Sequence, residues 1–150
     1  MSLQRFLEYA EAFEHAYASG QWQELASYFT DDAVYEIRMD DQAPVEYRGR
    51  EAVLDYLASV TEGFDKRFAS RKLLPFEAPR EAEDGVWLYG AAVYTMADGA
   101  RCHLVMEEQA IFSGERIARL VDYVTPGAVA EVQVIRQRYP EAFAGAPVPA

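Results

Sequence analysis

The hydrophobic pattern of the chain changes its period near Gly63, and this change constrains the fold more than any other feature. Before Gly63, apolar residues recur at three- and four-residue steps, which is typical of amphipathic helices. After it, apolar runs alternate with short turn sequences, which is typical of strands joined by hairpins. The pattern predicts an α+β fold with helices on one face of an antiparallel sheet. Such a sheet, if strongly curved, closes around a cavity that the helices cap.

The element boundaries follow from the same periodicity and from the turn residues. The predicted helices cover residues 6–19, 22–29, 50–61 and 128–138. The predicted strands cover residues 33–37, 45–48, 70–79, 86–96, 102–112 and 117–124, and residues 30–32 are expected to turn the chain into the first of them. We expect a single domain over residues 1–143. Residues 144–150, rich in Ala, Gly and Pro, are expected to form a disordered tail because they have little to bury.

Composition excludes several classes of partner. The apolar fraction of 51% is ample for a core, and the net charge of −11 argues against binding to nucleic acid or to an anionic membrane surface. The sequence shows no secretory leader and no apolar run long enough to cross a membrane, so the cytoplasm is the expected location. A single cysteine, Cys102, and two histidines leave too few ligands for a thiolate or multi-histidine metal site.

Two carboxylates stand out on predicted strands because each interrupts an apolar face. Side chains alternate between the faces of a strand, so Glu108 shares its face with Leu104, Met106 and Phe112. Asp122 likewise shares its face with apolar neighbours of the last strand. Counting outward from the turn at residues 113–115 places Glu108 opposite either Val121 or Asp122, and a bulge at the turn selects Asp122.

Two such acids side by side would form a general acid/base site. In a low-dielectric pocket both cannot stay ionised cheaply, so the pair would share a proton, one member donating and the other accepting. The alternative is structural. Either acid could lie in water at a strand end or pair with an arginine, the candidates being Arg67, Arg71 and Arg119.

Several sequence segments resemble the SnoaL-like branch of the nuclear transport factor 2-like superfamily. They are residues 20–25, 29–35, 47–52 and 114–117, together with Asp122-Tyr123. The resemblance covers roughly residues 5–125 and rests mainly on turns and on the starts of helices and strands. It implies an α+β fold in which a strongly curved antiparallel sheet wraps around N-terminal helices, as a cone-shaped barrel with one apolar pocket. It also implies a homodimer formed through the outer face of the sheet, and no cofactor or metal. The superfamily includes ketosteroid isomerases, limonene epoxide hydrolases, polyketide cyclases and pocketed proteins without known chemistry.

The functional residues of these relatives carry over only in part. The general-base aspartate of ketosteroid isomerases falls on Ile37 and their oxyanion tyrosine near Phe13, whereas their protonated acid falls on Glu108. The Arg-x-Asp of limonene epoxide hydrolases is replaced by residues 89–91, Tyr-Gly-Ala. Asp122 matches the acid/base position of SnoaL-like cyclases, and Glu108 stands near their histidine. This is the best partial match.

The residues and the resemblance together give two functional hypotheses. The first is a small cofactor-independent enzyme for isomerisation, cyclisation, dehydration or epoxide opening of an apolar ring-containing or polyketide-like molecule, with Asp122 and Glu108 as catalytic residues. The second is a pocketed small-molecule-binding or assembly protein without chemistry. Residues expected to contact the ligand in either case are Phe13, Tyr17, Tyr35, Ile37, Tyr56, Trp87, Tyr89 and Met106.

Overall fold

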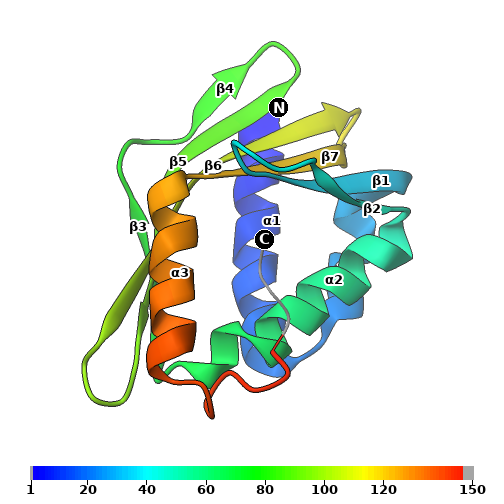
Figure 1. Ribbon diagram of the computed structural model, residues 1–150. Helices are drawn as coiled ribbons and strands as arrows, with labels where there is room; N and C mark the ends of the chain where they lie inside the picture. The colour runs from blue at the N-terminus through cyan, green and yellow to red at the C-terminus, as the bar shows by residue number, and fades with distance from the viewer. Residues whose placement is uncertain (1, 147–150) are drawn as a thin grey trace.

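The computed structural model describes residues 2–146 as a curved sheet with helices beneath it (Figure 1). The α-helices are α1 (Ser2–Ser19), α2 (Arg50–Gly63) and α3 (Pro126–Arg138), and short 3-10 helices η1 (Trp22–Tyr28) and η2 (Asp65–Arg67) join them to the sheet. The strands are β1 (Phe29–Arg38), β2 (Val45–Arg48), β3 (Ser70–Pro75), β4 (Arg80–Ala82), β5 (Gly85–Thr95), β6 (Arg101–Ser113) and β7 (Arg116–Val124).

The sheet has the strand order β2-β1-β7-β6-β5-β3, and the short β4 also pairs with β5. Within residues 2–146, β1 and β7 run parallel and the other paired strands are antiparallel. The predicted α+β class and strong curvature are confirmed, but the sheet is open and mixed rather than a closed antiparallel barrel. Periodicity indicates which face a side chain occupies and carries no information on the direction of a distant partner strand, so it could not reveal the parallel pair.

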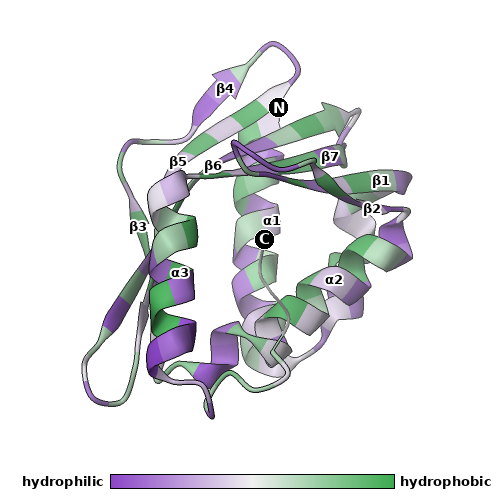
Figure 2. Ribbon diagram, viewed as in Figure 1, coloured by the Kyte–Doolittle hydropathy of each residue, from purple (hydrophilic) through white to green (hydrophobic). Residues whose placement is uncertain are grey.

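The helices pack on the inner face of the sheet, where the hydrophobic core lies. In α1 the buried residues Phe6, Tyr9 and Ala16 recur at helical spacing, and in α3 the buried residues are Ala128, Val132 and Ile135. Hydrophobic and hydrophilic residues alternate along the helices and strands in Figure 2, as expected for elements with one buried and one solvated face. The inner face of the sheet and the helices therefore enclose the space between them.

Two predicted boundaries are wrong for local reasons. Residues 30–32 do not turn the chain but belong to β1, which starts at Phe29 and pairs with β7 across a register shift between Phe29 and Val34. The strand expected over residues 70–79 ends at Pro75, since proline cannot donate to the ladder, and the chain bends before β4.

The C-terminal segment packs further than the sequence suggests. Phe143 lies against Phe64 and Phe68, and Ala146 is buried, so the packed chain passes the expected boundary at residue 143. The rest of the expected tail, residues 147–150, lies outside the described residues. Within residues 2–146, no helix combines the length and the apolar character needed to cross a membrane.

Candidate active-site cavity

A cavity of about 530 Å³ lies between the inner face of the sheet and the helices α1 and α2. Five of the expected ligand contacts line it: Phe13, Tyr35, Tyr56, Tyr89 and Met106. Its wall is mostly apolar, and Leu7, Leu73 and Leu74 are wall residues that are also exposed to solvent. The cavity therefore opens to solvent between α1 and β3, and its size suits a small organic ligand.

Three of the expected ligand contacts do not line the cavity. Trp87 is on the opposite face of β5, where it stacks on Tyr123 at 5.9 Å between ring centroids. Ile37 is buried in β1 beside Asp122, and Tyr17 lies behind the wall residue Arg71, against which it packs. The prediction for Trp87 failed because side chains alternate along β5: Leu88 pairs with the cavity residue Glu108, whereas Trp87 pairs with Gln109, which does not line the cavity.

Glu108 and Asp122 are direct partners in the ladder between β6 and β7. Along the ladder away from the turn at Gly114, the register shifts between Phe112 and Ile111. This shift aligns the two acids with each other. Gly114 itself has a φ of +62°, a conformation that residues with a Cβ rarely adopt. Both acids line the cavity, so a local feature of one hairpin brings them together on its wall.

The hydrogen bonds of the pair distinguish its two members. Tyr35 on β1 donates from its hydroxyl to Oδ2 of Asp122, and Glu108 hydrogen-bonds to Asp122 as well. Oδ1 of Asp122 is buried and accepts no hydrogen bond from a backbone N–H or from an ordinary side-chain donor of the described residues. Two ionised carboxylates cannot hydrogen-bond to each other, so the bond between these acids requires a proton, which Glu108 supplies as donor.

Burial and mutual charge shift the titration of both acids. Burial, followed by the negative charge of Asp122, raises the pKa of Glu108 well above its usual value. Burial also raises the pKa of Asp122, but the hydrogen bonds from Glu108 and Tyr35 oppose that rise. Glu108 is thus the protonated member of the pair and Asp122 the ionised member. Glu108 is partly accessible, whereas Asp122 is only 7% exposed.

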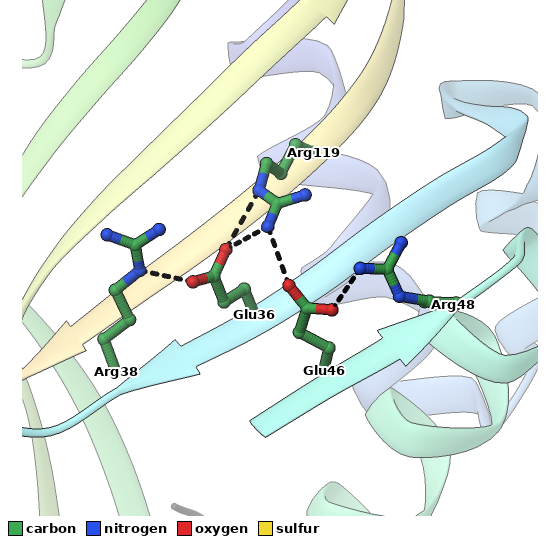
Figure 3. A network of polar contacts seen from close by, with 5 residues as sticks. All are labelled: Glu36, Arg38, Glu46, Arg48 and Arg119. Carbon is green, nitrogen blue, oxygen red and sulfur yellow. Dashed lines mark hydrogen bonds and ion pairs between the residues drawn. The ribbon is translucent and has the colours of Figure 1, made fainter. Parts of the chain in front are cut away.

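None of the arginines considered as partners forms an ion pair with either acid in the described structure. Arg67 donates to the carbonyl oxygens of Ala142 and Ala144, and Arg71 pairs with Glu14. Arg119 points to the outer face of the sheet, where it binds Glu36 and Glu46 (Figure 3). The charge of Arg71 does reach Glu108 and slightly opposes the rise of its pKa.

The outer-face network is separate from the cavity. It joins β1, β2 and β7 through Glu36, Arg38, Glu46, Arg48 and Arg119 (Figure 3). Glu36 is only 1% exposed, and the hydrogen bonds from Arg38 and then Arg119 lower its pKa. A buried carboxylate is stabilised here by cations, in contrast to the cavity pair, where one acid is stabilised by a proton on the other.

A second polar group on the cavity wall was not recognised from the sequence. Asp65 in η2 is buried, and burial raises its pKa to about 7 against the opposing effects of Arg71 and of a hydrogen bond with Tyr94. Asp65, Arg71 and Tyr94 all line the cavity. In the sequence Asp65 is followed by Lys66 and Arg67, so it resembles a solvated loop residue, and only the tertiary fold shows its burial.

The histidines lie away from this wall. His15 pairs with Glu24 at 2.8 Å and His103 with Glu131 at 3.1 Å, and both side chains are exposed. Among residues 2–146, no group of three or more histidine, cysteine, aspartate or glutamate side chains is arranged to hold a metal ion. The chemistry of the wall is therefore that of acids, tyrosines and one arginine.

Comparison with solved structures shows the same architecture in other proteins. An NTF2-like protein from Anabaena variabilis is similar to this chain with a TM-score of 0.64 and 17% identity, covering 82% of this chain and 88% of its own. A proposed isomerase from Bacillus subtilis has a TM-score of 0.65 and 17% identity, with 89% and 96% coverage. A proposed isomerase from Rhodopseudomonas palustris has a TM-score of 0.65 and 19% identity, with 89% and 97% coverage.

The sequence comparisons give the family. No protein with a curated description matches the chain. Residues 10–103, more than half of the chain, match the family described as the SnoaL-like domain. The structural similarities, all below 20% identity, agree with this match at the level of the fold. The chain belongs to the SnoaL-like domain family, and its fold is that of the NTF2-like protein of known structure.

Proposed function

We propose that this protein is a small enzyme that performs general acid/base chemistry, without a cofactor or metal, on an apolar ring-containing or polyketide-like molecule. The observation that carries the proposal is the pairing of Glu108 with Asp122 on the wall of an apolar cavity. Acids with displaced pKa values in a cavity are typical of catalytic sites. The reaction classes that suit the pair are isomerisation, cyclisation, dehydration and epoxide opening.

In this proposal the two acids have different roles. Asp122, the ionised member, accepts a proton from the substrate, and Glu108, the protonated member, donates a hydrogen bond to a substrate oxygen on which negative charge develops. When Glu108 donates its hydrogen bond to the substrate oxygen in place of Asp122, Asp122 loses a hydrogen bond that lowers its pKa. Asp122 then becomes a stronger base. Tyr35 keeps its hydrogen bond to Asp122 and fixes the orientation of that carboxylate.

The cavity wall supports an apolar substrate. Phe13, Tyr56 and Met106 contribute apolar surface, and a volume of about 530 Å³ falls in the range of pockets that hold small organic molecules. Burial of a ring against these side chains supplies binding energy without charge, so the acids are free to act on the polar group that the ring carries.

The direct test is solvent hydrogen exchange at carbon. The protein is incubated in heavy water with a panel of cyclic ketones and enones, and deuterium incorporation next to the carbonyl group is followed by NMR. Epoxides in the panel are followed by diol formation. We expect exchange or ring opening with at least one compound, a loss of about a hundredfold or more in Asp122→Asn, and a smaller loss in Glu108→Gln.

The matched control is Glu107→Gln, because Glu107 is adjacent in sequence but exposed on the other face of β6. It should leave the rate unchanged. If no compound reacts although some bind, or if Asp122→Asn and Glu108→Gln react as fast as the unmodified protein, the enzyme hypothesis is wrong. The pocketed binding protein then remains.

We also propose that two copies associate through the outer face of the sheet. Trp87 and Tyr123 stack on that face, and Val105 and Ile111 of β6 are partly exposed beside them. Light scattering at micromolar concentration should give about twice the chain mass of 16.9 kDa. A mass of one chain at every concentration would contradict this.

A further inference from the structure

The cavity has a second polar region near its opening, apart from the acid pair. Arg71 on β3 lines the wall, and its side chain is only 11% exposed. It lies close to residues of the opening, since Leu73 and Leu74 follow it on the same strand and Glu14 faces it from α1. In the ladder Arg71 pairs with Tyr94, whereas Glu108 is opposite Leu88, six residues earlier on β5. The arginine and the acid pair therefore lie at different positions along one cavity wall, although the charge of Arg71 still reaches Glu108.

The guanidinium of Arg71 is held in a fixed orientation. It lies over the ring of Tyr17 at 4.6 Å and near the ring of Phe13 at 5.7 Å, so cation–π contacts support its position. A planar guanidinium that is fixed in advance loses little conformational entropy when it binds an anion, and it presents donors suited to a carboxylate or a similar group.

The present partner of Arg71 is a carboxylate that can be displaced. Nη1 of Arg71 contacts both carboxylate oxygens of Glu14, each at 3.2 Å. Charge-assisted bonds of this kind are usually shorter, about 2.7–2.9 Å, so this contact is loose. The side chain of Glu14 is 49% exposed, so its carboxylate can return to water when another anion takes its place beside Arg71.

We infer that Arg71 is an anion-binding residue and that the ligand of this cavity is an apolar organic acid, whose anionic group displaces Glu14 at the opening while its apolar body extends toward Glu108 and Asp122. This inference rests on the proposed function in one respect, that the cavity is the ligand site. The arrangement leaves the anion near solvent and buries only the apolar body, which avoids the cost of burying a charge without a partner.

A matched pair of fluorescent probes tests this inference without knowledge of the natural ligand. Anilinonaphthalene sulfonate is an aromatic anion, and N-phenylnaphthylamine is the same skeleton without the sulfonate. We expect the unmodified protein to prefer the anion, with each probe displacing the other. Arg71→Gln should reduce the affinity for the sulfonate by roughly tenfold or more and leave that for the neutral probe nearly unchanged. The control Arg101→Gln removes the same charge from an exposed position away from the wall and should change neither.

A second variant keeps the test decisive if Arg71→Gln does not fold. Glu14→Gln removes the competing carboxylate and should increase the preference for the sulfonate several-fold. Its control is Glu11→Gln, which removes a charge from another exposed wall residue of α1 without an ion pair to Arg71 among the described contacts. The inference is overturned if both probes bind equally well, or if Glu14→Gln has no larger effect than Glu11→Gln. A failure of acid/base activity would appear in hydrogen exchange and not in this preference.

Discussion

The acids of this protein have different protonation states because their surroundings differ. Glu36 is buried among arginines and its pKa is lowered, whereas Glu108 is buried beside another acid and its pKa is raised. Asp65 is intermediate, since Arg71 and Tyr94 only partly offset its burial. Residue type therefore does not fix charge in this protein, and the neighbours of each carboxylate do.

Asp65 gives a pH dependence of stability whose sign can be worked out. Its folded pKa of about 7 lies above the usual value of 3.8, so between these values the folded state holds a proton that the unfolded state has released. The free energy of unfolding must then decrease as pH rises through this window. In urea denaturation, the free energy of unfolding of the unmodified protein should fall by up to about 1.4 kcal/mol per pH unit relative to that of Asp65→Asn, because the asparagine cannot ionise.

The control for this measurement is Asp55→Asn, an exposed position on α2. The difference in unfolding free energy between this variant and the unmodified protein should stay flat over the same pH range. If the difference between Asp65→Asn and the unmodified protein also stays flat, Asp65 is ionised in the folded protein at low pH, and its burial does not govern its charge.

At the scale of elements, the β6–β7 hairpin determines whether the site exists. The register shift near Phe112 aligns Glu108 with Asp122, and a slip of one residue would turn the acid of one strand away from the cavity. Sequence alternation could place both acids on apolar faces, but it left their pairing open between two registers. Only the geometry of the turn chooses between them, because a bulge has no periodic signal in the sequence.

Gly114 provides a test of that hairpin. Its φ of +62° strains any residue with a Cβ, so Gly114→Ala should lower the free energy of unfolding by about 1 kcal/mol. The control is Gly127→Ala in the first turn of α3, where φ is not positive and a Cβ would meet nothing within 4 Å. That change should be neutral or slightly stabilising. Equal effects of the two substitutions on chemical denaturation would show that the turn conformation does not constrain the hairpin.

At the scale of the whole molecule, the sequence was most informative where a pattern is local. Helical and strand periodicity predicted the α+β class, most element positions and the acid-bearing faces, because these depend on neighbours along the chain. It could not reveal the parallel pairing of β1 with β7, the burial of Asp65, or the bond from Tyr35 to Asp122, because each joins segments far apart in sequence. Arg71 was considered only as a partner for the acids, and its position on the cavity wall became visible in the fold.

The measurement that most directly tests the acid/base site is a carboxyl-carbon NMR titration of Glu108 and Asp122 in the unmodified protein and in Glu108→Gln, Asp122→Asn and Tyr35→Phe. We expect one acid to titrate above about pH 6 in the unmodified protein, and its pKa to fall in the variant that neutralises its neighbour. The pKa of Asp122 should rise in Tyr35→Phe, because this change removes a hydrogen-bond donor to its carboxylate. If both acids titrate near about 4 in every protein, the carboxylates are solvated and independent, and the proposed catalytic pair is contradicted.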